Sequence, residues 1–409
     1  MPIGVLKKLI KRVRLNVLMS NSAIKDQKLI QLSPMQKDGV DKAASWFKKG
    51  MSSTFTLTGY AGSGKTTCVE AMIENLDIGL RNVSFVSPTG KAALVMAQKA
   101  QGKYRATTIH KLIYDYDDIH GFSLKSSEKL KGIELIVCDE ASMIDQSVLE
   151  DLLSFNIPII FIGDNAQLLP VGKKTNLLET PDVMLTEIHR QAADNPIIHL
   201  SMLAREGKDI PFQKFGKHAV VIPKKRIYDN PAKFNEWASR ADQVICGKNK
   251  TRNGMNKRIR SYKGYTSPFP QKGDKMICTR NNWLLTAGGF PMVNGLTGTV
   301  EYKINKASKN DEIKRDCMKV NLKPDFTDVT FQGLHLLHSP FVGKEEKLRG
   351  EEYSSYVDMD YGYAITCNKA QGSEFGNVVV WNEVLNYKEH EKWLYTAITR
   401  ASNNLILIK

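Results

Sequence analysis

One octapeptide, Gly59-Tyr60-Ala61-Gly62-Ser63-Gly64-Lys65-Thr66, constrains the fold of this 409-residue chain more than any other feature. It fits the pattern G-x-x-x-x-G-K-[ST], whose backbone N–H groups surround phosphates. A β-branched run at 54–58 precedes it, and a helical pattern at 67–73 follows it. An isolated match could be a chance glycine loop, but the position between strand and helix predicts a nucleoside triphosphate site.

Each residue type in this loop suits a triphosphate. The glycines let successive N–H groups converge on the β-phosphate at a helix N-terminus. Lys65 is expected to neutralise charge on the β- and γ-phosphates, and the Thr66 hydroxyl to complete the coordination shell of Mg²⁺. The other residues expected to bind the nucleotide are Gly59, Ala61, Gly62, Ser63, Gly64 and Thr67.

Two later strand ends carry polar residues suited to hydrolysis. The apolar run 135–138 ends in Asp139 and Glu140, and another apolar run leads into segment 163–170, which contains Gln167. Ligands bind where parallel strands end. Asp139 is expected to hold Mg²⁺ through water, Glu140 to polarise the attacking water, and Gln167 to contact the γ-phosphate. A single acidic pair is often only a surface feature, but the order of these segments favours catalysis.

Strand and helix patterns alternate through the first half of the chain. The strands are expected at 83–86, 135–138 and 159–162, and helices start at Lys91 and Gln146. This alternation predicts a RecA-like domain with a parallel sheet over residues 31–190.

A second parallel sheet is expected in the other half. Its strands are predicted at 244–246, 363–366, 377–381 and 405–408, with a helix at 251–260. No second phosphate loop occurs there. A second domain made of 191–264 and 361–409 is therefore expected to have no phosphate loop of its own, and it would close over the nucleotide held by the first.

Two stretches interrupt these patterns. Residues 114–124, within an insertion at about 112–130, can form a hairpin that turns at His120-Gly121. Residues 265–360 contain short strand patterns and turn signals, which predict a small β-barrel inserted in the second domain.

Composition agrees with a polyanionic partner. The chain has 58 Lys and Arg against 43 Asp and Glu, a net charge of +15, and a pI of about 9.3. A solvated basic surface is the alternative. The six cysteines have no C-x-x-C spacing and are expected to be reduced, buried thiols. His335 and His338 lack a nearby cysteine or acidic pair, so no metal site is expected there.

The N-terminal 18 residues carry five positive charges, no acidic residue and apolar residues at helical spacing. They suit a membrane-surface helix, a DNA-binding arm, a basic tail spanning 1–30, or an upstream extension if translation also begins at Met19. No run of 18 apolar residues occurs, so no membrane span is expected. The expected location is the cytoplasm, or the host cytoplasm if a phage encodes the chain.

Segments in a fixed order resemble superfamily 1 helicases of group B, the RecD-like and Dda-like DNA helicases. Besides the octapeptide and the Asp139-Glu140 and Gln167 segments, they are 32–36, 87–93, 106–112, 185–191, 363–375 and 394–401. The resemblance covers nearly the whole chain beyond residue 30. One departure is Asn368, where relatives usually carry histidine.

The resemblance implies roles for further residues. Gln36 would contact adenine, Arg190 and Arg400 would reach the γ-phosphate, and Gly372 and Glu374 would lie at the nucleotide. A surface salt bridge is the alternative for either arginine. The expected DNA contacts are Pro88, Thr89, Lys91, Thr107, Thr108, His110 and Phe122 on the first domain, and Thr366, Lys369 and Ser373 on the second. For any single threonine among them, a helix cap is the alternative.

The resemblance also implies fold and activity. The expected fold class is α/β, with two RecA-like parallel-sheet domains, a small β-hairpin (pin) insertion in the first and an SH3-like β-barrel insertion in the second. The pin would split duplex DNA, with Phe122 stacked at the fork, although a packed hairpin aromatic is the competing interpretation.

The implied protein is an ATP-dependent DNA helicase that uses ATP and Mg²⁺ and moves 5′ to 3′ in replication, recombination or repair. Its expected partners are single-stranded DNA, forked duplex DNA and replication or recombination proteins, and it is expected to be a monomer. The alternative is a DNA-stimulated translocase that remodels protein–DNA complexes without processive unwinding. RNA stays open as the track.

Overall fold

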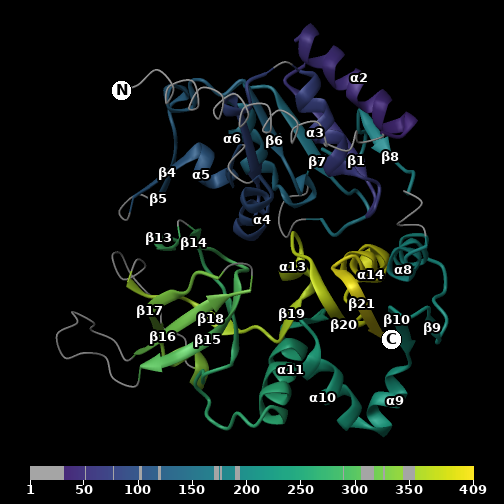
Figure 1. The fold of residues 1–409 in the computed structure, drawn as a ribbon, viewed down its shortest axis with the longest axis vertical. Coiled ribbons are helices and arrows are strands. Elements are labelled where there is room, and N and C mark those ends of the chain that lie inside the picture. The colour runs from purple at the N-terminus through teal and green to yellow at the C-terminus, as the bar shows by residue number, and fades with distance from the viewer. Residues whose placement is uncertain are drawn as a thin grey trace, which may run out of the picture.

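The structure is a computed structural model that describes residues 32–50, 52–76, 78–100, 104–117, 121–169, 175, 177–188, 194–288, 290–304, 317–325, 328–343 and 355–409. The expected basic tail at 1–30 and Arg190 lie outside these residues. Figure 1 shows two α/β layers stacked along the long axis, with a third, antiparallel sheet beside the lower one. In the described part of the chain, no helix is long and apolar enough to cross a membrane.

The first sheet is six-stranded and parallel, in the order β3-β2-β6-β7-β1-β8. Its strands are β1 (Thr54–Gly59), β2 (Val83–Ser87), β3 (Arg105–Thr108), β6 (Leu135–Cys138), β7 (Ile159–Gly163) and β8 (Val183–Leu185). The helices of this part are α2 (Pro34–Lys49), α3 (Lys65–Asn75), α4 (Gly90–Ala100), α5 (Ile109–Ile113) and α6 (Gln146–Leu153).

Helices cover both faces of this sheet, which explains its continuous apolar strands. In β7, Ile160 and Ile162 pack with α2 and α3, whereas Ile159 and Phe161 pack with α5 and α6. The strands predicted near 54–58, 83–86, 135–138 and 159–162 are all present.

The second sheet has the order β19-β11-β20-β21-β10-β9 and is parallel except for β9. Its strands are β9 (Lys214–Phe215), β10 (Ala219–Ile222), β11 (Gln243–Cys246), β19 (Ala364–Thr366), β20 (Phe375–Trp381) and β21 (Ala401–Ile408). Its helices are α8 (Pro196–Arg205), α9 (Lys224–Asp229), α10 (Pro231–Arg240), α11 (Asn249–Tyr262), α13 (Cys367–Ala370) and α14 (His390–Ile398).

The helices again form two layers. Side chains of α8, α13 and α14 share one core with Ile245, Val378 and Val380 of the sheet. Helices α9, α10 and α11 share a separate core with Val244 and Val379, whose side chains point to the other face. Both predicted parallel sheets, and with them the α/β fold class, are confirmed. The domain boundaries stay predictions.

The third sheet is antiparallel, in the order β17-β16-β15-β12-β18. Its strands are β12 (Lys275–Cys278), β15 (Thr297–Ile304), β16 (Cys317–Pro324), β17 (Phe331–Leu337) and β18 (Met359–Tyr361), and β13 (Asn282–Ala287) pairs with β14 (Phe290–Met292) as a separate hairpin. The Val357 N–H donates to the His335 carbonyl at 2.9 Å, so the segment before β18 reaches β17 and the two sheet edges meet. The SH3-like character of this insertion stays a prediction.

The hairpin expected at 114–124 consists of β4 (Tyr114–Asp117) and β5 (Gly121–Leu124). Asp117 pairs with Gly121, so Gly121 belongs to the second strand and not to the turn. The turn residues 118–120 lie outside the described residues. Short 3₁₀ helices complete the described elements: η1 (Leu80–Asn82), η2 (Ser127–Leu130), η3 (Ala141–Met143), η4 (Ser339–Val342) and η5 (Tyr387–Glu389).

Candidate nucleotide site

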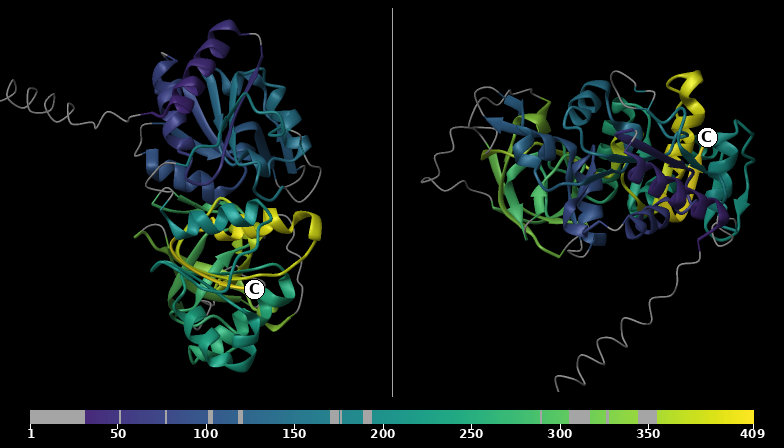
Figure 2. Two further views of the ribbon diagram at one scale, coloured as in Figure 1. Left: turned by 90° about the vertical axis from the view of Figure 1, so that its right-hand side faces the viewer. Right: turned by 90° about the horizontal axis from the view of Figure 1, so that it is seen from above.

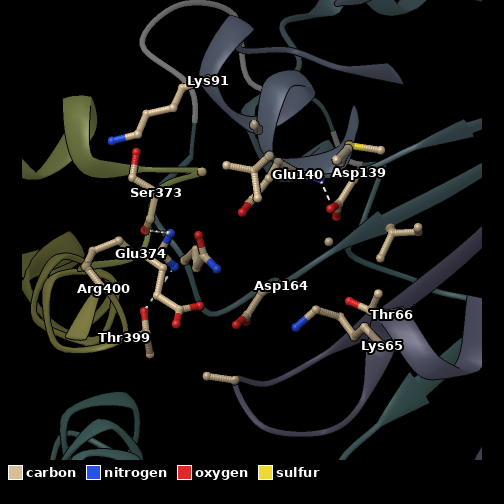
Figure 3. Close-up of a pocket in the computed structure, with 18 of the residues that line it drawn as sticks. Lys65, Thr66, Lys91, Asp139, Glu140, Asp164, Ser373, Glu374, Thr399 and Arg400 are labelled. Atoms are coloured by element: carbon tan, nitrogen blue, oxygen red, sulfur yellow. Dashed lines mark hydrogen bonds between the residues drawn. The ribbon is translucent and has the colours of Figure 1, made fainter. Parts of the chain in front are cut away.

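A cavity of about 640 Å³ lies between the first and second sheets. Figure 3 shows that residues of both sheets line it. The first sheet contributes Lys65, Thr66, Asp139, Glu140, Asp164 and Gln167, and the second contributes Gly372, Ser373, Glu374, Thr399 and Arg400. The sequence-predicted catalytic residues therefore meet at one cavity, apart from Arg190, which the structure does not describe.

The phosphate loop connects β1 to α3 with a backbone that requires glycine. Gly62 and Gly64 have φ angles of 80° and 76°, in the left-handed region that glycine adopts without steric cost. A Cβ atom on Gly59 would lie 2.5 Å from the Ser63 Oγ. Of the predicted loop residues, Ala61, Gly62, Lys65 and Thr66 line the cavity, whereas Gly59, Ser63, Gly64 and Thr67 do not.

Two side chains hold this loop. Lys65 Nζ donates to the carbonyls of Gly59 at 2.7 Å and Tyr60 at 3.2 Å. The buried Gln36 donates from Nε2 to the carbonyls of Ser63 at 3.4 Å and Gly64 at 3.3 Å. Gln36 also forms a reciprocal capping box with Ser33 at the start of α2. Gln36 therefore holds the backbone of the phosphate loop in the structure. Its predicted contact with adenine stays a prediction.

The carboxylates of Asp139 and Glu140 follow β6. The Asp139 Oδ1 accepts the Glu140 N–H at 2.8 Å, and Glu140 has φ 55° and ψ 38°. This left-handed backbone costs a non-glycine residue roughly 1–2 kcal/mol. Burial, and then the charge of Asp139, raise the pKa of the Glu140 carboxyl above its usual range, while Arg400 and Lys65 oppose the rise. A carboxylate with a raised pKa is a better proton acceptor near neutral pH.

The residues present fit a nucleotide–magnesium complex. Thr66 and Asp139 both line the cavity and offer the hydroxyl and carboxylate oxygens that Mg²⁺ prefers alongside phosphates and water. The buried Gln167 lines the cavity, and its side-chain oxygen has no hydrogen-bond partner among the described residues. This oxygen accepts hydrogen bonds, so an ordered water would satisfy it, while the amide N–H₂ group could donate to a phosphate.

Arg400 follows α14 and is 6% exposed. Its Nε donates to the Thr396 carbonyl, one Nη to the Ser373 carbonyl and the other to the Thr399 hydroxyl, each at 3.2 Å. These partners are all neutral, and Arg400 forms no ion pair with any described residue. Its charge is therefore available to a phosphate in the cavity.

A tyrosine that the sequence analysis did not single out joins the two halves of the site. The Tyr395 hydroxyl donates to the Asp164 Oδ2 at 2.5 Å and accepts the Ala61 N–H at 2.8 Å. Burial and the Asp164 charge raise the pKa of Tyr395, so the phenol stays protonated and can donate. Tyr395 and Asp164 lie within motif segments, which was the only signal that could have found them.

Further bonds hold the loop after β7 to the second sheet's helices. The Leu168 N–H donates to the Thr396 Oγ1 at 2.9 Å, and Gln371 Nε2 donates to the Leu168 carbonyl at 2.8 Å. The Arg205 guanidinium stacks on the Tyr60 ring, 3.5 Å from its centre. The phosphate loop and the Gln167 loop are thus both attached to the second half of the molecule.

Several predicted DNA contacts cap helices. Thr89 Oγ1 accepts the Ala92 N–H at 3.3 Å, and the Thr108 and Thr366 hydroxyls cap α5 and α13 at 3.1 and 3.4 Å. The alternative role, a helix cap, is therefore present at these three threonines. Thr89 is partly buried, whereas Thr108 and Thr366 are buried, so the DNA contacts of these threonines stay predictions. Pro88 and Thr107 are partly buried, at the end of β2 and within β3.

The predicted lysine contacts lie at junctions between the sheets. Lys91 lines the cavity with its Nζ 4.5 Å from the centre of the Phe375 ring, and burial lowers the pKa of Lys91 to about 8. Lys369 Nζ donates to the Asn294 Oδ1 at 3.2 Å, next to the third sheet. Burial, followed by repulsion from Arg252, lowers the pKa of Lys369.

The remaining predicted residues divide between the cavity and the hairpin. Ser373 is buried in the cavity wall, Gly372 has a φ of 68°, and Glu374 is exposed at the cavity. The His110 ring centre lies 5.8 Å from that of Phe122, and burial lowers the pKa of His110. Phe122 is 56% exposed despite this contact.

Comparisons with known proteins agree with this arrangement. A family model described as an AAA domain matches residues 31–222, and one described as a UvrD-like helicase C-terminal domain matches 361–408. The ATP-dependent RecD2 DNA helicase of Deinococcus radiodurans is 27% identical over 361 residues, covering 84% of this chain and 45% of the relative. The ATP-dependent DNA helicase dda of Enterobacteria phage T4 is 34% identical over 170 residues, covering 37% of this chain and 38% of the relative.

A crystal structure of the Pif1 helicase from Candida albicans has the same fold, with a TM-score of 0.54, 18% identity and coverage of 93% of this chain and 95% of that one. This chain spans less than half the length of the two curated relatives above. The fold and site define a two-domain protein with a P-loop nucleotide site. Within that class, the chain belongs to the superfamily 1 helicases of group B.

Proposed function

We propose that this protein is an ATP-dependent DNA helicase that moves 5′ to 3′ on single-stranded DNA. The observation that carries the proposal is one cavity that brings Lys65 and Glu140 of the first sheet together with Arg400 of the second. A site assembled from two domains is sensitive to their spacing, so hydrolysis can drive relative movement. The T4 and Deinococcus relatives are both named as ATP-dependent DNA helicases.

The residues have separate roles in hydrolysis. Lys65 and the loop N–H groups would hold the β- and γ-phosphates, and Glu140 would accept a proton from the attacking water. Bound Mg²⁺, held by Thr66 and Asp139, would neutralise phosphate charge. Arg400 would stabilise the charge that develops in the transition state, an effect of roughly 10³ to 10⁵ in rate in related phosphoryl-transfer enzymes. Arg190 remains proposed for a similar contact.

DNA would cross both sheets along the predicted contacts. Thr89, Thr107, Thr108 and His110 would hold it on the first sheet, and Thr366 and Lys369 on the second. Hydroxyls and cations that touch phosphates give a sequence-independent track. Lys91 and Ser373 lie where this track would meet the nucleotide cavity, which suits residues that couple the two ligands.

The β4–β5 hairpin is proposed as the pin. It is anchored at its base, because the Tyr114 hydroxyl donates to Asp151 at 2.5 Å and Lys129 pairs with Asp115 at 2.7 Å. Lys125 Nζ also donates to the Lys111 carbonyl at 2.6 Å. An exposed Phe122 on a fixed hairpin can stack on the last base pair of a fork.

The decisive experiment is unwinding of matched duplexes that carry a single-stranded tail on either the 5′ or the 3′ end. Wild-type protein with ATP should separate only the 5′-tailed duplex, and Lys65→Ala should separate neither while still binding single-stranded DNA. DNA-stimulated hydrolysis without strand separation would favour the translocase alternative. If RNA oligonucleotides stimulate ATP hydrolysis and DNA oligonucleotides do not, the protein moves on RNA.

The cofactors, the partners, the oligomeric state and the location of the protein are also proposals. We propose ATP and Mg²⁺ as the cofactors, single-stranded and forked DNA as the nucleic-acid partners, and replication or recombination proteins as candidate partners. A monomer in the cytoplasm, or the host cytoplasm for a phage protein, is the expected state. Sedimentation of the purified chain with and without DNA tests the monomer.

A further inference from the structure

The net positive charge of the chain comes from two segments. Residues 1–31 hold seven Lys or Arg and one Asp, which leaves 51 cations and 42 acids over 32–409. Residues 223–264 alone hold 12 of these cations and three of the acids, so the remainder of 32–409 contains 39 of each. Outside the first 31 residues, the net positive charge therefore resides in the segment that forms α9, α10 and α11.

Part of this charge is used inside the protein. Arg260 forms a buried ion pair with Asp274, Arg252 pairs with Asp360, and the exposed Arg240 pairs with Glu236. Arg258 donates to the Pro231 carbonyl and lies over the Phe234 ring. Arg258 thus joins α11 to α10, Arg252 joins α11 to β18, and the Arg240 pair lies within α10.

Seven other cations of this segment are exposed and form no ion pair with any residue that the structure describes. They are Lys225, Arg226, Lys233, Lys248, Lys250, Lys257 and Lys263; we call them the basic face. A set of like charges without acidic partners repels itself, so it favours a polyanion. A merely solvated surface usually mixes both signs of charge.

Aromatic residues accompany the cations. Tyr228 at the end of α9 is 67% exposed, and Tyr262 at the end of α11 is 51% exposed. Phosphate-binding cations together with exposed aromatic rings suit single-stranded nucleic acid, because unpaired bases can stack on the rings. A duplex presents its phosphates but not the faces of its bases.

Most of the basic face lies away from the proposed track, but Lys248 and Lys250 follow β11, whose Cys246 pairs with Thr366 of the track. Helices α9, α10 and α11 pack on one face of the second sheet, whereas α14, which contacts the phosphate loop through Tyr395, packs on the opposite face. Figures 1 and 2 show these three helices at the end of the molecule farthest from the first sheet. The thickness of a sheet therefore separates the basic face from the nucleotide cavity.

We propose that the basic face is a second binding surface for single-stranded nucleic acid, reached by a strand long enough to continue past the track. The inference rests on the proposed function in taking DNA as the polyanion. It adds a contact that a short oligonucleotide confined to the track cannot make.

The test compares two triple variants with the same change in charge. The first is Lys225→Glu, Arg226→Glu and Lys233→Glu on the basic face. The control is Lys48→Glu, Lys49→Glu and Arg81→Glu, three exposed cations of the first domain without an ion-pair partner among the described residues. Binding of fluorescent single strands is measured against salt, with the shortest oligonucleotide that fully stimulates ATP hydrolysis and with one several times longer.

For the long strand, the basic-face variant should bind at least about 10-fold more weakly at low salt, and its slope of log affinity against log salt should be shallower by about 2, since each lost phosphate contact removes roughly 0.7. The short strand and the control variant should behave as wild type. A second variant, Tyr228→Ser with Tyr262→Ser, should weaken the long single strand but not a duplex of equal length.

Three results would overturn the inference: equal losses in both triple variants, no loss in either, or a duplex that depends on the basic face more than a single strand does. ATP hydrolysis with the short strand keeps this test separate from the proposed function. Wild-type protein that no strand stimulates would contradict the helicase proposal, whereas normal stimulation with an unchanged long-strand affinity would contradict only the basic face.

Discussion

The Tyr395 hydroxyl of α14 donates to the Asp164 carboxylate of the loop after β7 at 2.5 Å, across the boundary between the two parallel sheets. The same oxygen accepts the Ala61 N–H of the phosphate loop. One buried atom thus joins the segment that holds phosphate, the segment that carries Gln167 and the helix that precedes Arg400. Its loss should loosen all three together.

Tyr395→Phe removes this oxygen and keeps the ring. The turnover number for DNA-stimulated ATP hydrolysis should fall about 10-fold, equivalent to roughly 1.4 kcal/mol of barrier, because Gln167 and Arg400 lose one of the bonds that hold them against the phosphate loop. The KM for ATP should change little, since Lys65 and the glycines remain. Tyr387→Phe, a change of the same chemistry at an exposed site, is the control. Wild-type turnover in a stable Tyr395→Phe protein would contradict this role.

The acidic limb of the pH–rate profile should report Glu140. Hydrolysis needs the deprotonated carboxylate, and because its pKa is raised, turnover should decline at a higher pH than for an ordinary glutamate as the pH falls. Arg400 opposes this rise, so Arg400→Gln should move the limb to still higher pH, while Arg400→Lys should leave it near its wild-type position. If the acidic limb of the pH–rate profile lies at the same pH in wild type and Arg400→Gln, a group other than Glu140 titrates.

Glu140→Gln provides a separate test of the same carboxylate. The variant should bind ATP with Mg²⁺ but hydrolyse it poorly, because only the proton acceptor is lost. Binding is measured with a fluorescent ATP analogue and turnover by phosphate release. Turnover equal to wild type would remove Glu140 from its role.

Replacement of the β4–β5 hairpin by a Gly-Ser turn should separate two activities. DNA-stimulated hydrolysis should persist, because the cavity and the track lie outside the hairpin, and unwinding of a forked duplex should collapse. Phe122→Ala should give a milder form of the same split. If hydrolysis and unwinding decline together with thermal stability, the hairpin serves packing, and unchanged unwinding would place the wedge elsewhere.

The buried pair of Arg260 and Asp274 should be important for stability. Arg260 binds both carboxylate oxygens at 2.9 Å, and the Tyr363 hydroxyl donates to the same carboxylate at 3.0 Å. Asp274→Ala should lower the free energy of unfolding by about 3–5 kcal/mol, since it leaves a buried guanidinium unpaired. Denaturant titration measures the loss, and Glu236→Ala, in the exposed pair with Arg240, should have little effect. A small loss at Asp274 would show that water replaces the carboxylate.

The strands that carry the phosphate loop and the Asp139-Glu140 pair could be predicted from sequence, because buried parallel strands are short, continuous apolar runs. Strands β9 and β10 could not be predicted in this way. The apolar run at 219–222 is short, and nothing in its sequence indicates that it pairs with β21. The bond between Tyr395 and Asp164 joins residues 231 positions apart, and no local pattern encodes such a pairing.

The surroundings of Lys91 show a second limit. Its segment marks a strand-to-helix turn, but the packing of α4 against other domains decides where the side chain lies. A Cβ on the neighbouring Gly90 would come within 2.4 Å of Val293, so the segment that follows the β13–β14 hairpin packs against this turn. Lys91 itself lies beside Phe375 and lines the cavity.

At Glu140, the left-handed backbone lowers stability, while the side chain is the one proposed to accept a proton. Glycine or asparagine would adopt this conformation at lower cost, yet neither carries the carboxylate. Selection of variants for thermal stability alone would therefore favour substitutions at position 140 that abolish ATP hydrolysis. A screen that also measures activity would retain the glutamate.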